Sequence, residues 1–261
     1  MIFALSLAAP SSAAASSVGW AYSRMVAALF GRLRVLRERP NGGAAGQEAA
    51  LTAPNATTLQ AEYQSVINRY HITSIDFDIE GAPETDQRSL TMRDQSLVGL
   101  EAANPDLKVS FTLPVLPTVL DNNGLGVLQA AKRDGVRIDL VNVMAMDYGA
   151  SVDNNGQMGL DAVDAAKATE QQLNSLGMTN AKIGITPMIG LNDVSPETFT
   201  LADATTLLNY AQSDPRVTEL SMWSVARDNN TGGTHYVAPD NSGITQTPYQ
   251  FSGIFHQFDH A

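Results

Sequence analysis

The sequence predicts an α/β fold in which parallel strands alternate with helices, and three observations support this prediction. The chain has 261 residues, a length that suits one large domain of about 250 residues. Strand-like segments recur at intervals of roughly 35 residues, with helical patterns between them, as in successive βα units. Acidic residues gather along one of these segments. Together these features indicate a TIM (β/α)8 barrel whose main domain spans residues 41–261.

The stretch from Ser74 to Gly81 alternates apolar and acidic residues with the period of two that is typical of a β-strand. Its apolar members are Ile75, Phe77 and Ile79, and its acidic members are Asp76, Asp78 and Glu80. Helical patterns on both sides place this strand in a βαβ series, whose strands are normally buried on both faces. Carboxylates are tolerable there only at the C-terminal mouth of the sheet, where α/β enzymes keep their chemistry. The stretch therefore predicts an active site.

Three carboxylates on one face of a strand disfavour ionisation of the whole set, because same-face neighbours lie only about 6.6 Å apart. We expect the set to titrate as a coupled group in which at least one carboxylic acid keeps its proton near neutral pH. A general acid needs such a proton. Glu80 is assigned this role because it has the longest side chain and the outermost position. The alternative is a carboxylate cluster that binds Mg²⁺ or Ca²⁺.

The composition narrows the classes of function further. A net charge of −11 argues against nucleic-acid binding and favours a neutral or cationic substrate. The absence of cysteine excludes disulfides and thiolate catalysis. No apolar stretch is long enough to span a membrane, and the four histidines lack the spacing of metal ligands. We therefore expect no metal, no cofactor, and neither nucleic acid nor membrane as a partner.

The first 40 residues form an atypical N-terminal segment, with five arginines and one glutamate in an otherwise acidic chain. Residues 1–8 read as a buried second strand in preference to a signal peptide, which would need a positively charged start. Trp20–Glu38 has the apolar periodicity of a basic helix that ends before Pro40. Counting back from the acidic strand leaves no residues for a first strand. The barrel is therefore expected to be incomplete on its N-terminal side.

The remainder of the chain continues the alternation of strands and helices. Helices are expected near residues 160–176 and 196–212. The terminal segment Thr247–His260 is expected to begin with the aromatic loop Tyr249-Gln250-Phe251 and to close as a last helix. The predicted strands after the acidic one are Val109–Pro114, Ile138–Tyr148, Ile183–Gly190 and Glu219–Val225.

Asp76-Phe77-Asp78-Ile79-Glu80 resembles the D-x-D-x-E core of the signature of glycoside hydrolase family 18, the chitinases. Thr73 stands where the fuller signature has one more Asp. The resemblance implies a TIM barrel with this motif on the fourth strand. It also implies that Glu80 protonates the glycosidic oxygen while the N-acetyl carbonyl of the substrate attacks the anomeric carbon. Asp78 would then orient the acetamido group and stabilise the oxazolinium intermediate, and Asp76 would tune Asp78.

Met144-Ala145-Met146-Asp147-Tyr148 resembles the M-x-Y-D motif of the family, with Met146 in place of the tyrosine. A bacterial and archaeal branch shares this variant, in which Tyr148 takes over the role of the aromatic hydroxyl. The resemblance implies that Asp147 and Tyr148 hold the N-acetyl carbonyl. Filling of the barrel core is as good an explanation of Met144 and Met146 as substrate contact.

Three further positions resemble substrate contacts of the family. Trp223, at the end of the last strand, would form the floor under the sugar whose bond is cut, since its ring offers a large face to the CH groups of a pyranose; a buried core tryptophan is the alternative. Asp193 resembles a substrate-contacting acid after the seventh strand, with Asn192 as its weaker neighbour. Gly43 belongs to a double glycine that resembles the S-x-G-G motif, with Pro40 in place of the serine.

The resemblance covers residues 41–258 and implies a secreted, retaining hydrolase of chitin or chito-oligosaccharides, the β-1,4-linked polymers of N-acetylglucosamine, although the chain has no convincing signal peptide. An endo-β-N-acetylglucosaminidase of glycoprotein glycans is an alternative with an overlapping signature. A non-catalytic chitin-binding relative is disfavoured because Glu80 is kept. A third alternative is an inactive product whose N-terminus is truncated or read in the wrong phase.

Overall fold

The computed structural model describes residues 2–3, 32–34, 48–152 and 154–260 of the chain. These residues form two compact units, and each is described by itself. The N-terminal unit comprises residues 6–111 and 123–139, and the C-terminal unit comprises residues 1–5, 112–122 and 140–261. Strand β4 (Lys108–Pro114) contributes residues to both. Among the described helices, none combines the length and the apolar character that crossing a membrane requires.

The N-terminal unit contains a parallel sheet in the order β4–β3–β2. Strand β3 (Ser74–Asp78) is the predicted acidic strand, which is thereby confirmed. Strand β2 (Arg32–Arg34) runs parallel to it, with Leu33 opposite Ile75. The prediction of a helix over Trp20–Glu38 is therefore wrong at these three residues. Backbone pairing with the edge of β3 is a tertiary interaction, and it overrides the local helical periodicity.

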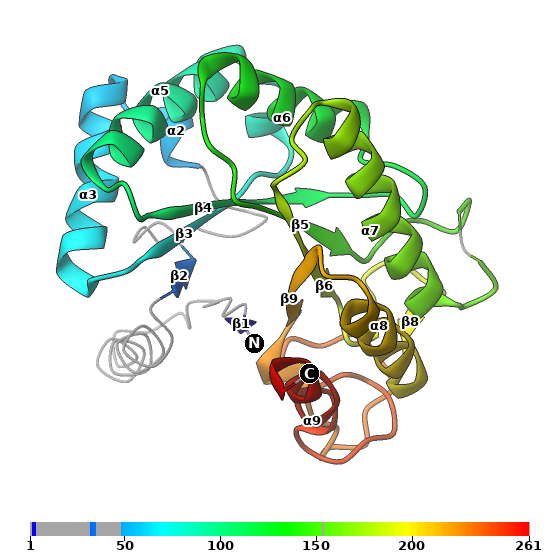
Figure 1. The fold of residues 1–261 in the computed structure, drawn as a ribbon. Coiled ribbons are helices and arrows are strands. Elements are labelled where there is room, and N and C mark those ends of the chain that lie inside the picture. Colours follow the sequence, from blue (N-terminus) through cyan, green and yellow to red (C-terminus); the bar gives the residue numbers. More distant parts are fainter. Residues whose placement is uncertain (1, 4–31, 35–47, 153, 261) are drawn as a thin grey trace. The chain divides into compact units, whose positions relative to one another are not determined.

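Helices of the N-terminal unit pack against this sheet through an aromatic cluster. Figure 1 shows α3 and α5 lying together on one side of β3 and β4. The ring of Tyr63 on α3 meets that of Phe77 edge-on at 5.2 Å between centroids, and Phe77 meets Phe111 at 6.0 Å. All three side chains are buried. The helices are α2 (Ala49–Thr52), α3 (Ala56–Tyr70), α4 (Ala82–Thr85), α5 (Gln87–Ala103) and α6 (Asn122–Asp134).

Two charged residues of α5 are completely buried. Arg93 bonds with both carboxylate oxygens of Glu48, at 3.1 and 3.2 Å, and its guanidinium lies 5.4 Å from the ring centre of Phe111. Asp94 lies beside it at 3.9 Å from Nε, and neither of its carboxylate oxygens has a hydrogen-bond partner among the described residues. Burial raises the pKa of Asp94 to about 7, with Arg93 opposing the shift. The carboxyl group is therefore a site of pH-dependent stability.

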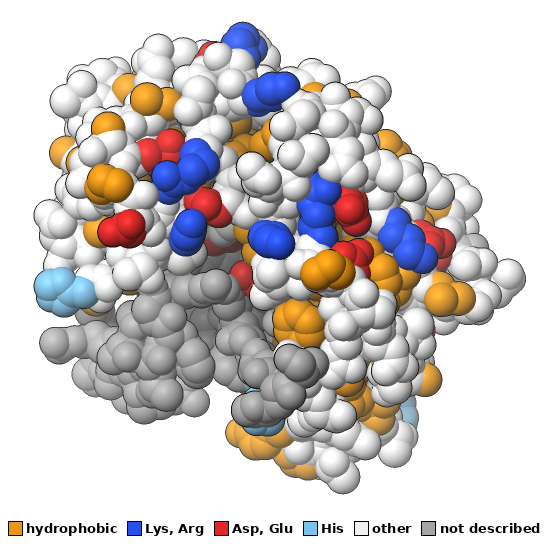
Figure 2. All heavy atoms as spheres, viewed as in Figure 1, with side chains coloured by type: hydrophobic (Ala, Val, Ile, Leu, Met, Phe, Trp, Pro, Cys, Tyr) orange, Lys and Arg blue, Asp and Glu red, His pale blue; other side chains and the backbone are white. Residues whose placement is uncertain are grey.

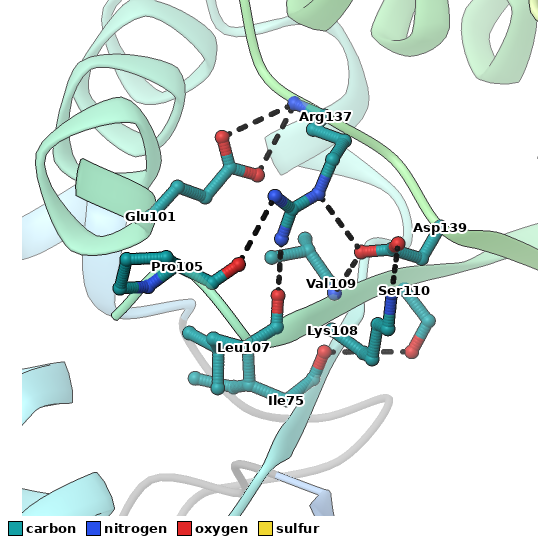
Figure 3. Close-up of polar contacts among 9 residues, drawn as sticks. All are labelled: Ile75, Glu101, Pro105, Leu107, Lys108, Val109, Ser110, Arg137 and Asp139. Atoms are coloured by element: carbon teal, nitrogen blue, oxygen red, sulfur yellow. Dashed lines mark hydrogen bonds and ion pairs between the residues drawn. The ribbon is translucent and has the colours of Figure 1, made fainter. Parts of the chain in front are cut away.

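A polar network ties the end of α5 to the start of β4 and to the chain before β5 (Figure 3). The Arg137 guanidinium donates to the carbonyls of Pro105, at 3.3 Å, and Leu107. Asp139 accepts the Val109 amide at 3.0 Å. We expect these hydrogen bonds to backbone groups to contribute more to stability than the exposed ion pairs of Asp139 with Lys108 and Arg137, because exposed ion pairs contribute little. On the face shown in Figure 2, acidic and basic side chains are interspersed over the surface.

The C-terminal unit contains a parallel sheet in the order β1–β9–β6–β5–β4. Strands β5 and β6 are largely buried on both faces, and α7 and α8 lie beside them in Figure 1. The remaining strands of this sheet are β1 (Ile2–Phe3), β5 (Leu140–Ala145), β6 (Lys182–Pro187) and β9 (Val217–Met222). Outside it lie β7 (Gly190–Leu191), β8 (Thr198–Phe199), α7 (Met158–Ser175), α8 (Leu201–Ser213), η1 (Val225–Arg227), α9 (Gln250–Phe255) and η2 (His256–His260).

Most predicted elements of the C-terminal unit are confirmed to within a few residues. One difference concerns the helix predicted over 196–212, which begins only at Leu201 because Thr198–Phe199 pairs with Gly190–Leu191 as an antiparallel hairpin. A second concerns the start of the chain. Ile2–Phe3 pairs in parallel with β9, the last strand, whereas the sequence assigned residues 1–8 to a second strand.

A buried polar ladder joins the strands of the C-terminal unit on one face of the sheet. The Asn142 amide donates to the Thr112 hydroxyl at 3.0 Å, and its carbonyl oxygen accepts the Thr186 hydroxyl at 2.9 Å. These three side chains come from β4, β5 and β6, and each is nearly inaccessible to solvent. Because each hydrogen bond pairs groups that would be costly to bury alone, the ladder fixes the register of the three strands.

Candidate active site

The acidic strand separates its two faces as the sequence predicts. Ile75, Phe77 and Ile79 are buried, whereas Asp76, Asp78 and Glu80 are half-buried and retain access to solvent. Asp76 accepts the Ser110 hydroxyl of the neighbouring strand β4 at 2.7 Å. The innermost carboxylate is therefore held in place by the sheet itself, while the other two follow towards the exit of the strand.

The turn after Glu80 is closed by a residue that the sequence analysis missed. Gly81 has φ of +66°, a conformation that favours glycine. Its amide donates to the Glu84 carboxylate at 2.5 Å, and the Glu84 amide donates back to the Gly81 carbonyl at 3.1 Å. Glu84 is buried. This reciprocal cap fixes the backbone directly beyond Glu80, and the spacing G-x-x-E before a short helix was its signal in the sequence.

In the C-terminal unit, the chain leaves β5 through a left-handed turn at Asp147, with φ of +52°. The Asp147 amide donates to the Asn192 side-chain oxygen at 3.3 Å, and the Asp147 carboxylate accepts the Val194 amide at 2.9 Å. Burial raises the pKa of Asp147; the Val194 amide opposes the shift and the charge of Asp193 adds to it. Asp147 and the loop at 192–194, which the sequence proposed separately, are thus in direct contact.

Tyr148 is almost wholly buried, in contrast to the half-buried Asp147 before it. Its hydroxyl has no hydrogen-bond partner among the residues that the structure describes. Burial, together with the nearby charges of Asp161 and Glu197, raises the pKa of Tyr148 well above its ordinary value. The hydroxyl therefore stays protonated and is a neutral hydrogen-bond donor.

Trp223 lies at the end of β9 and is half-buried, so its ring is not wholly enclosed in a core. Its amide donates to the Pro187 carbonyl at 2.8 Å, and its carbonyl accepts the Ile189 amide at 3.0 Å. Met144 and Met146 are also half-buried, on either side of the fully buried Ala145. Asp193 is exposed, and Gly43 lies outside the described residues.

A buried arginine, Arg227, joins the loops near Trp223. It was not identified from the sequence, because no local pattern marks this position. Arg227 is only 1% exposed. Its guanidinium donates to the carbonyls of Ile189, at 3.1 Å, Leu191, at 2.5 Å, and Ala238. Burial lowers the pKa of Arg227, and the charges of Asp193 and Asp147 oppose this shift. One side chain thereby joins the loop after β6 to the loop after β9.

A metal centre finds no support among the described residues, where no three His, Asp or Glu side chains form a group that could hold an ion. What the described geometry offers instead is acid–base chemistry on β3, and an aspartate, a neutral tyrosine hydroxyl and an aromatic ring at the strand ends of the C-terminal unit.

Comparisons with known proteins find curated relatives over most of the chain. It is 34% identical over 265 aligned residues to a probable bifunctional chitinase/lysozyme of Escherichia coli (strain K12), covering 92% of this chain and 29% of that protein. It is 32% identical over 235 residues to Endochitinase 11 of Metarhizium anisopliae, covering 82% of this chain and 45% of that protein. The chain thus spans less than half the length of these relatives. No protein-family model matches it.

Solved structures are similar in both sequence and fold. Active domain 2 of a chitinase from Pyrococcus furiosus is 31% identical, with a TM-score of 0.76 over 88% of this chain and 72% of that one. The catalytic domain of a hyperthermophilic chitinase from the same organism is 33% identical, with a TM-score of 0.75 over 84% and 71%. A family GH18 chitinase domain from a fern shares the fold at 16% identity and a TM-score of 0.54.

Proposed function

Because the chain belongs to glycoside hydrolase family 18, the family of the chitinases, we propose that it hydrolyses β-1,4-linked N-acetylglucosamine polymers with retention at the anomeric carbon. The observation that carries the proposal is the row of half-buried carboxylates that begins on β3 and continues to Glu80, two residues beyond the strand and beside the turn closed by Glu84. Support for the substrate comes from the Pyrococcus furiosus chitinase domain that was crystallised with chito-oligosaccharides.

In the proposed mechanism the substrate supplies its own nucleophile. Glu80 donates a proton to the glycosidic oxygen, while the N-acetyl carbonyl oxygen attacks the anomeric carbon and forms an oxazolinium ion. Asp78 stabilises the positive charge of this ion, and Asp76, held by Ser110, keeps Asp78 in place. Glu80 then removes a proton from the water that opens the oxazolinium ring. Two inversions at the same carbon give retention.

Four residues bind the sugar in this proposal, namely Asp147, Tyr148, Trp223 and Asp193. Asp147 and Tyr148 hold the N-acetyl group in its attacking position, and the protonated Tyr148 hydroxyl is suited to donate to a carbonyl oxygen. Trp223 supports the apolar face of the pyranose, and Asp193 contacts the neighbouring sugar. Secretion and an incomplete N-terminal side of the barrel both stay predictions.

The direct test is the action of the purified protein on soluble chito-oligosaccharides. We expect cleavage, and NMR recorded in the first minutes should show the β-anomer as the initial product. An α-anomer would contradict the substrate-assisted mechanism. Binding with no cleavage would favour the non-catalytic alternative, and cleavage of glycoprotein glycans in place of chitin oligomers would favour an endo-β-N-acetylglucosaminidase.

Replacing Asp78 with asparagine should lower kcat by roughly 10²-fold, because the oxazolinium ion loses its nearest negative charge. Steady-state kinetics on soluble chito-oligosaccharides measure the effect. An undiminished kcat in a folded Asp78→Asn variant would show that this carboxylate does not stabilise the oxazolinium ion.

Chelation separates this mechanism from the alternative in which the carboxylates bind Mg²⁺ or Ca²⁺. The proposed chemistry uses only protons and the N-acetyl group of the substrate, so activity after exhaustive dialysis against EDTA should stay within about twofold of that of the untreated enzyme. Loss of activity on chelation, with recovery on adding back Mg²⁺ or Ca²⁺, would support the metal alternative.

A further inference from the structure

Glu197 is a buried carboxylate that grips the backbone of a distant segment. It lies just before strand β8 and is only 2% exposed. Its Oε2 accepts the Tyr148 amide at 3.0 Å, and its Oε1 accepts the Gly149 amide at 2.6 Å. A carboxylate is costly to bury, and hydrogen bonds to a charged acceptor are about twice as strong as neutral ones. Burial of this carboxylate therefore indicates that the backbone segment at Tyr148 and Gly149 must be held in one conformation.

The segment that contains Glu197 holds three consecutive amides of the turn after β5. The Asp147 amide is bound by the Asn192 side chain at 3.3 Å, and the next two amides are bound by Glu197. In return, the Val194 amide donates to the Asp147 carboxylate at 2.9 Å. The backbone of Asn192 is itself fixed, because its backbone N–H donates to the backbone carbonyl of Glu197 at 3.1 Å. Residues 192–197 thus clamp both the backbone and the side chain of Asp147.

The clamped turn has a conformation that would not persist by itself. Asp147 has φ of +52°, which is unfavourable by roughly 1 kcal/mol for a residue with a Cβ atom, and Gly149 follows with φ of +99°. The backbone N–H groups of Tyr148 and Gly149 converge on one anion as a result. Without the Glu197 carboxylate, these two donors would lose their acceptor, and the turn would be free to relax to a right-handed conformation.

We propose that Glu197 is a positioning residue for hydrolysis, which sets the orientation of Asp147 and Tyr148 without touching the substrate. The inference rests on the proposed function, in which these two residues hold the N-acetyl group that acts as nucleophile. A small misplacement of such a group costs rate more than affinity, because the attack geometry tolerates less displacement than binding does.

The test compares Glu197→Gln with the matched variant Asp228→Asn. Asp228 is also buried, at 1% exposure, and its carboxylate also accepts two consecutive backbone amides, those of Phe251 and Ser252, at 3.0 and 2.8 Å. Both variants lose one charged acceptor, so we expect similar losses in Tm. Glu197→Gln should lower kcat about 10- to 100-fold with KM changed less than threefold, whereas Asp228→Asn should keep kcat within threefold of wild type.

A double-mutant cycle shows whether Glu197 acts through Asp147. In the cycle with Asp147→Asn, the two losses in kcat/KM should be clearly less than multiplicative, because both changes disable the same group. Glu197→Asp keeps the charge on a shorter side chain, and it should retain a kcat between those of wild type and Glu197→Gln. If Glu197→Gln does not fold, Glu197→Asp carries the test with an expected loss in kcat of at least threefold.

The outcomes separate this inference from the proposed function. An active wild-type enzyme with a folded Glu197→Gln variant of undiminished kcat would overturn the positioning role alone. The same conclusion would follow from multiplicative losses in the cycle, or, where only the shorter variant folds, from Glu197→Asp with the wild-type kcat. A wild-type protein that leaves chito-oligosaccharides intact would overturn the proposed function and, with it, the inference that rests on it.

Discussion

Glu80→Gln is expected to lower the rate of chito-oligosaccharide hydrolysis by about 10³- to 10⁴-fold, while the affinity for the oligosaccharide changes little. The amide has nearly the shape of the carboxylic acid but cannot transfer a proton, so both proton transfers of the proposed mechanism are lost. Single-turnover kinetics measure the rate, and isothermal titration calorimetry of the variant measures binding without turnover. The rate should fall further for a sugar leaving group than for an aryl group, which departs with less help from an acid.

The control for this variant is Glu62→Gln. Glu62 lies on the exposed side of α3 in the same unit as Glu80, and its replacement removes the same charge from the protein. The control should keep the wild-type rate. A Glu80→Gln protein that cleaves chito-oligosaccharides at the parental rate would show that another group is the general acid.

Between pH 5 and pH 8 the Asp94 carboxyl group is expected to lower the free energy of unfolding of the wild type by about 3 kcal/mol, and Asp94→Asn should abolish this decrease. The pKa of the buried Asp94 is raised from 3.8 to about 7, chiefly by desolvation. The folded state therefore binds this proton more tightly than the unfolded state does. The resulting stabilisation is complete below about pH 4, falls as the pH rises towards 7, and is absent above it. Asparagine, which does not titrate, has no such dependence.

Urea denaturation at pH 5 and pH 8 measures the effect as a difference between wild type and variant. Four charged groups act on the pKa of Asp94. Arg93 and Arg133 oppose its rise, whereas Asp134 and Glu48 add to it. The control is Asp106→Asn, at an exposed position of the same unit, and its stability should follow that of wild type at both pH values. Equal pH dependence in Asp94→Asn and wild type would show that the carboxyl group is hydrated or paired in solution.

A local sequence pattern predicted the strand that carries acidic residues of the candidate site, and the structure confirms this strand. The alternation from Ile75 to Glu80 identified a strand with one apolar and one acidic face, because burial on a strand repeats every two residues whatever lies around it. Apolar runs at regular intervals located β4, β5, β6 and β9, and helical periodicity located the helices between them. The family signature was readable for the same reason, since its residues lie within a few positions of one another on single strands.

Local patterns failed where a distant partner decides the outcome. Arg32–Arg34 pairs with β3 as a strand although its neighbourhood has the period of a helix, and the first turn predicted for the helix at 196–212 is instead the hairpin of β7 and β8. In both places the backbone pairs with another segment, 42 residues away for Arg32–Arg34 and seven to nine residues away for Thr198–Phe199. Such pairing overrides local preference.

The sequence by itself determined the family, the acidic strand and the residues at the strand ends, because these depend on spacing within a single element. Only the tertiary structure decided how those residues are held. Arg227 joins two loops, and Glu197 reaches the amides of Tyr148 and Gly149 across 48 residues of sequence or more. A buried charge is stable only where the fold brings donors or acceptors to it, and no local pattern records which distant backbone groups those are.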